Sequence, residues 1–73
     1  MEYNVKQANV IFMEGRHSAA VEIYRELAKG GDSEAAFNYA FCRLFGLGCP
    51  IDESEAKSYF VFSSGYIPDA YYN

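Results

Sequence analysis

The chain repeats part of its own sequence at a spacing of about 35 residues. Residues 35–38 (AAFN) resemble residues 70–73 (AYYN), and Gly30 recurs as Gly65 at the same offset. Other alanine and aromatic positions recur at offsets between 32 and 36 residues: Ala8 with Ala40, Ala20 with Ala56, and Tyr24 with Phe60. A period of this length is typical of repeat proteins, in which each unit is a pair of helices that buries its apolar face against the next unit.

The offset varies because one turn inside the unit changes length. That turn covers residues 15–17 in the first copy and residues 46–51 in the second. We therefore predict an all-α fold of two helix-turn-helix repeats, followed by a C-terminal stub that begins a third helix pair. The expected units of this single domain are residues 3–31, 32–65 and 67–73.

Apolar residues at three- and four-residue spacing predict four complete helices. The expected helices cover about residues 3–14, 18–29, 33–45 and 52–64, with a fifth opening at Pro68. The expected N-caps are Ser18, then Asp32 or Ser33, and then Asp52 with Glu55 three residues later. Glycine ends these helices because it accepts the left-handed conformation, and the expected ends are Gly15, Gly30 with Gly31, and Gly65.

Small residues recur where two antiparallel helices must approach closely. They are Ala8, Ala20, Ala40 and Ala56. Larger side chains are expected to fill the space beside them: Phe12, Tyr24, Leu44 and Phe60. We expect both sets to be buried in the helix pairs.

The second copy resembles the Sel-one-like repeat, a relative of the tetratricopeptide repeat. The matching positions are Asn38-Tyr39, Gly46-Leu47-Gly48, Asp52, Ala56, Tyr59-Phe60, Gly65 and Asp69-Ala70. The first copy lacks the Gly-x-Gly turn, and Cys49 and Ser63-Ser64 depart from the usual residues of the family. The resemblance implies a right-handed α-α superhelix that acts as an adaptor for other proteins, and it carries over no catalytic residue.

Charge argues against nucleic acid and against an anionic membrane surface as partners. The formal net charge is −4, and the six Lys and Arg residues form no cluster. The first ten residues, MEYNVKQANV, lack the basic and apolar regions of a secretory signal. No apolar run approaches the roughly 18 residues of a membrane span, so we expect a cytoplasmic protein.

No set of residues in the sequence points to catalysis, a metal or a cofactor. His17 has no Cys or acidic partner at a recognisable spacing, so we interpret it as an exposed turn residue. Cys42 and Cys49 are expected to be free thiols, and a disulfide between them is the less favoured alternative. We therefore predict that the protein is not an enzyme.

Seven Tyr and six Phe residues exceed what two helix pairs can bury, so some must pack on a partner or a neighbouring unit. The candidates for a partner-binding surface are Phe37, Tyr39, Phe41, Tyr66, Tyr71 and Tyr72. A stacking role between repeats is the alternative for the same residues. Two functions follow as hypotheses. One is a protein-interaction module with a groove for a protein or peptide. The other is a structural unit that forms homo-oligomers through exposed repeat ends, or a fragment of a longer array.

Overall fold

The computed structural model describes residues 3–64 and shows an all-α protein over that range. Its four helices are α1 (Val5–Met13), α2 (His17–Lys29), α3 (Ser33–Phe45) and α4 (Glu53–Phe62). The all-α prediction is therefore confirmed for these residues. The predictions for Gly65, Tyr66, Tyr71, Tyr72 and the helix opening at Pro68 lie outside the described residues.

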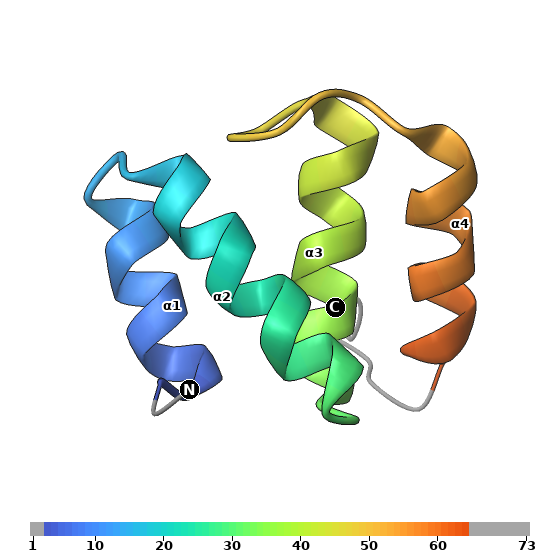
Figure 1. Ribbon diagram of the computed structural model, residues 1–73, viewed down its shortest axis with the longest axis horizontal. Helices are drawn as coiled ribbons and strands as arrows, with labels where there is room; N and C mark the ends of the chain where they lie inside the picture. The colour runs from blue at the N-terminus through green and yellow to red at the C-terminus, as the bar shows by residue number, and fades with distance from the viewer. Residues whose placement is uncertain (1–2, 65–73) are drawn as a thin grey trace, which may run out of the picture.

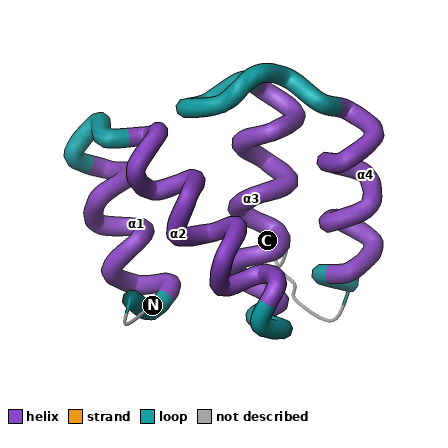
Figure 2. Tube along the Cα trace, in the orientation of Figure 1, coloured by secondary structure: helices purple, strands orange, loops and turns teal. Residues whose placement is uncertain are grey.

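The helices form two antiparallel pairs, α1 with α2 and α3 with α4 (Figure 1). Each helix packs against the next one along the chain, so α2 and α3 join the pairs. Short turns connect α1 to α2 and α2 to α3, whereas a longer loop connects α3 to α4 and extends over the start of α2 (Figure 2).

Helix α1 begins with a capping box that the sequence analysis missed. The Asn4 side chain accepts a hydrogen bond from the Gln7 backbone N–H at 2.9 Å, and the Gln7 side chain accepts one from the Asn4 N–H at 2.8 Å. The helix therefore starts at Val5 rather than at Tyr3. Gly15, with φ of +88°, follows its last turn as predicted.

Helix α2 begins one residue before the predicted cap. Arg16 is the N-cap, its side chain makes no capping hydrogen bond, and Ser18 lies inside the first turn. The prediction of Ser18 as a cap is wrong because His17 is already helical and stacks on Phe12, with ring centroids 4.2 Å apart. This contact also makes His17 half-buried rather than exposed.

Aspartates cap the second pair of helices. Asp32 accepts a hydrogen bond from the Ala35 N–H at 2.9 Å, so Asp32 and not Ser33 is the N-cap of α3. Asp52 accepts one from the Glu55 N–H at 3.0 Å, but the Asp52 N–H donates to the Arg43 carbonyl and not to Glu55. The capping-box pattern at α4 is thus only half formed, because the Glu55 side chain bonds elsewhere.

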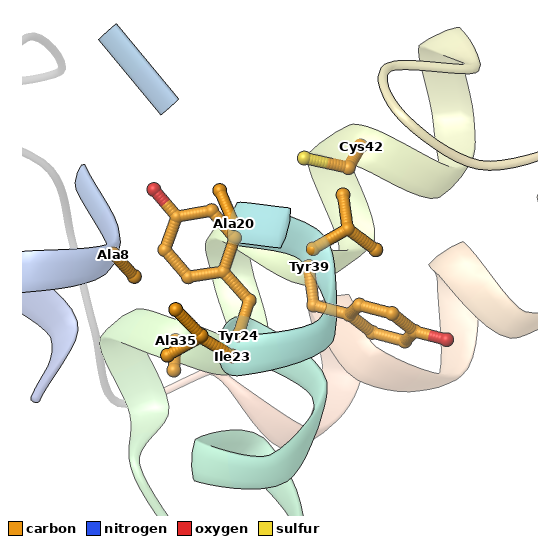
Figure 3. Close-up of a cluster of buried hydrophobic side chains, with 8 residues drawn as sticks. Ala8, Ala20, Ile23, Tyr24, Ala35, Tyr39 and Cys42 are labelled. Atoms are coloured by element: carbon orange, nitrogen blue, oxygen red, sulfur yellow. The ribbon is translucent and has the colours of Figure 1, made fainter. Parts of the chain in front are cut away.

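The core lies where α1, α2 and α3 meet, around Tyr24 and Tyr39 (Figure 3). The same cluster includes Ala8, Ala20 and Ala35. The four alanines predicted at close helix contacts are all buried: Ala8, Ala20, Ala40 and Ala56. Tyr24 is buried as predicted, whereas Phe12, Leu44, Tyr59 and Phe60 are only partly buried. Small side chains let the helices approach closely, and the aromatic rings fill the remaining space.

Candidate partner-binding surface

A hollow of about 380 Å³ lies between α1 and α3, and we call it the α1–α3 hollow. It is lined by Asn9, Phe12, Met13, Tyr24, Phe37, Asn38, Phe41 and Cys42. Two of the six residues proposed as a partner surface, Phe37 and Phe41, therefore line one hollow. Asn9 and Met13 of α1 also line the hollow, although no sequence pattern singled them out.

The walls of the α1–α3 hollow are aromatic and aliphatic. Phe41 is 43% exposed and Met13 is 85% exposed, so both present apolar surface to water. Phe37 is half-buried and meets Phe60 of α4 edge to face, with ring centroids 5.4 Å apart. Phe41 also contacts Phe45 one turn further along, at 4.7 Å. Neighbouring rings thus restrain both Phe37 and Phe41.

Three polar side chains of the hollow are joined by hydrogen bonds. The Tyr24 hydroxyl donates to Asn9 Oδ1 at 2.5 Å, and Asn38 Nδ2 donates to the same oxygen at 3.2 Å. Burial, with smaller effects from Cys42 and Glu34, raises the pKa of Tyr24 to about 12, so the phenol keeps its proton at neutral pH. Asn9 Nδ2 and Asn38 Oδ1 have no hydrogen-bond partner within residues 3–64.

Tyr39 is not part of this surface, which corrects the sequence-based prediction. It is 1% exposed and faces α4, because it lies two residues from Phe37 and Phe41 and therefore on the opposite side of α3. Its hydroxyl donates to Glu55 Oε1 at 2.5 Å, and its ring meets Tyr59 edge to face at 4.9 Å. Burial and the Glu55 hydrogen bond raise the pKa of Tyr39.

Arg43 completes the contact between α3 and α4. The Arg43 Nε donates to Glu55 Oε1 at 2.8 Å and lies 3.1 Å from the Tyr39 hydroxyl. The Arg43 Nη1 donates to the Pro50 carbonyl at 3.0 Å. The hydrogen bond with Tyr39, together with that to Glu55, raises the pKa of Arg43. This network links α3, α4 and the loop between them, so its role is structural.

A second hollow, of about 490 Å³, lies between α3 and α4, and we call it the α3–α4 hollow. It is lined by Leu44, Glu53, Ala56, Lys57, Phe60 and Val61. Val61 is 68% exposed, and the next residue, Phe62, is also exposed. Apolar surface on α4 is thus open to contact.

The described part of the chain holds two free thiols and no cluster of metal-ligating side chains. Within residues 3–64, no three His, Cys, Asp or Glu side chains gather closely enough to hold a metal ion. Cys42 is a buried free thiol and Cys49 a half-buried one. None of the four helices is long and apolar enough to cross a membrane.

Residues 3–64 thus form an all-α protein with an apolar hollow between its first and third helices. Compared with known proteins, the chain matches no family model, no curated protein and no solved structure.

Proposed function

We propose that this protein is a protein-interaction module that binds a segment of a partner protein in the α1–α3 hollow. The observation that carries the proposal is apolar surface left in water, above all at Met13 and Phe41, around a hollow of about 380 Å³. Methionine and aromatic residues are enriched at protein interfaces, and ligand sites have volumes of about 300–1,000 Å³. Binding would remove this surface from water, which is favourable.

The proposed scaffold is a right-handed superhelix of the Sel-one-like kind, in which α1 and α3 are the first helices of two successive repeats. The internal period of about 35 residues and the packing of each helix on the next support it. The hollow then lies between equivalent helices of adjacent repeats. On this proposal the protein acts in the cytoplasm as a non-enzymatic adaptor.

A peptide-display selection tests the proposal. The full chain is used to select binding peptides from a random library, and their affinities are measured for the Phe41→Glu and Val61→Glu variants. Phe41 lines the hollow, whereas Val61 is exposed on α4 and is not part of the lining. We expect Phe41→Glu to weaken binding by about 30-fold or more, as at an interface hot spot, and Val61→Glu to change it little. Failure to enrich any peptide, or equal losses in the two variants, would contradict the proposal.

Self-association through the α3–α4 hollow is the second candidate function. It is favoured by the exposure of Val61 and Phe62 on α4. Light scattering at micromolar concentration should then show a dimer or larger species, which Val61→Lys dissociates and Phe41→Glu does not. A monodisperse 8.2 kDa monomer would rule this candidate out.

A further inference from the structure

A side-chain amide can make four hydrogen bonds, and within residues 3–64 Asn9 makes two of them and Asn38 one. Asn9 Oδ1 accepts hydrogen bonds from the Tyr24 hydroxyl and from Asn38 Nδ2, so the two amides are joined directly. Within residues 3–64, Asn9 Nδ2 donates to nothing and Asn38 Oδ1 accepts from nothing. Two hydrogen-bonded amides in the lining of an apolar hollow thus offer one further donor group and one further acceptor.

A peptide main chain has the complementary pair of groups. In an extended segment, the N–H and C=O of one residue point to the same side of the chain, and they can pair with an adjacent acceptor and donor. A purely apolar occupant would instead displace water from both asparagines and replace neither hydrogen bond, which is unfavourable. The polar part of the hollow thus favours an amide over a hydrocarbon.

The lining is also uncharged at neutral pH. None of the lining residues within 3–64 is Lys, Arg, Asp or Glu, and burial holds the pKa of Cys42 and of Tyr24 at about 12. The whole chain carries a net charge of −4. A carboxylate would therefore lose its hydration in the hollow and gain no cation, so a chain terminus or an acidic side chain fits poorly there.

We infer that the Asn9–Asn38 pair binds the main-chain N–H and C=O of one residue in an extended, uncharged peptide segment, while its apolar side chain packs between Phe12 and Phe41. This inference rests on the proposed function and adds the chemistry of the partner. Specificity for sequence would then come from the apolar side chain, because the asparagine pair contacts groups that every residue except proline carries.

Three small probes separate main-chain recognition from simple apolar binding. The first is N-acetyl-L-phenylalanine N-methylamide, and the second is its ester analogue, in which oxygen replaces the phenylalanine N–H. The third is N-acetyl-L-phenylalanine, which carries a carboxylate. Each is titrated into the isotope-labelled full chain, and NMR shifts report the affinity and the place of binding.

We expect the amide probe to shift signals of the residues lining the α1–α3 hollow. The ester should bind about 2- to 12-fold more weakly, which corresponds to one net hydrogen bond, and the carboxylate more weakly still. In the Asn38→Ala variant, which lacks the acceptor, amide and ester should bind equally. In the Val61→Glu control, which alters an exposed residue of α4 outside the lining, the preference for the amide should persist.

Each other outcome overturns the inference. Equal binding of amide and ester to the wild-type hollow would exclude main-chain recognition and leave the hollow as a binding site. Shifts elsewhere, or none up to the solubility limit, would exclude this ligand class, while the display selection separately decides whether the module binds peptides. If the NMR signals of the lining residues shift when the protein alone is diluted, the occupant of the hollow is a second copy of this chain.

Discussion

Gly48 and His17 touch through their backbones, although they belong to different helix pairs. A Cβ atom built at Gly48 would lie 2.5 Å from the carbonyl carbon of His17 and 2.7 Å from the backbone nitrogen of Ser18. The α3–α4 loop thus rests directly on the first turn of α2 (Figure 1). Gly48 also has φ of +76°, so both its conformation and its surroundings require glycine.

Gly48→Ala should destabilise the fold more than Gly15→Ala. Both glycines have positive φ, but a Cβ at Gly15 would meet nothing within 4 Å. We expect Gly15→Ala to cost about 1–2 kcal/mol for the backbone conformation alone, and Gly48→Ala about 2–5 kcal/mol because overpacking adds to it. Urea denaturation followed by circular dichroism measures both, and equal losses would show that the loop does not rest on α2.

Tyr39→Phe should destabilise the protein, whereas Tyr59→Phe should not. The Tyr39 hydroxyl bonds to Glu55 and Arg43, but the Tyr59 hydroxyl has no hydrogen bond within the described range 3–64. Losing hydrogen bonds to charged groups costs about 1.5–3 kcal/mol, and an uninvolved hydroxyl less than about 0.5 kcal/mol. If the two variants unfold at the same denaturant concentration, the network contributes nothing to stability.

The two cysteines should react with a thiol reagent at very different rates. Cys49 is half-buried, whereas Cys42 is buried and burial raises the pKa of its thiol to about 12, so its reactive thiolate is scarce. Without reductant, we expect one thiol to react fast in the native protein and both thiols to react fast after denaturation. Cys49→Ser should remove the fast phase and Cys42→Ser should leave it. A native protein that shows no free thiol even when denatured would instead contain the disulfide.

Stability should fall as pH rises from about 9 to 12. Burial raises the pKa of Cys42 from its ordinary 9.0, and that of Tyr24 from its ordinary 10.0, to about 12 in the folded chain. Below about pH 9 the Cys42 thiol and the Tyr24 phenol are protonated in both the folded and the unfolded chain. Above it these groups lose their protons in the unfolded chain first, which favours unfolding. Denaturation curves across this range should show a shallower decline for Cys42→Ala than for Cys49→Ala. A decline of equal slope in the two variants would exclude Cys42 as a contributor.

The sequence predicted the helices well because their signals are local. Helix α3 has the bounds that its apolar spacing and its capping aspartate indicated, and the glycine turns lie where predicted. The error at Ser18 arose because a tertiary contact, the stacking of His17 on Phe12, determines where α2 begins. The missed cap at Asn4 was recoverable, since Gln7 stands three residues later and completes a capping box.

The candidate site was only partly predictable. Phe37 and Phe41 share the side of α3 that lines the α1–α3 hollow, and their spacing of four residues indicates this. Tyr39 lies two residues from each, so the same helical geometry turns it toward α4. No sequence pattern around Asn9 predicted its place in the hollow. Its position there depends on hydrogen bonds with Tyr24 and Asn38, which lie 15 and 29 residues away in the chain.

The sequence by itself determined the number of described helices, the turns between them and the small residues where they meet. Those features depend on backbone preference and on apolar spacing within a few residues. Only the tertiary structure decided that Gly48 rests on His17, that Tyr39 is buried against Glu55, and that Asn9 and Asn38 share one hollow. Such contacts depend on how one helix pair packs against the other, and no local pattern in the chain encodes that arrangement.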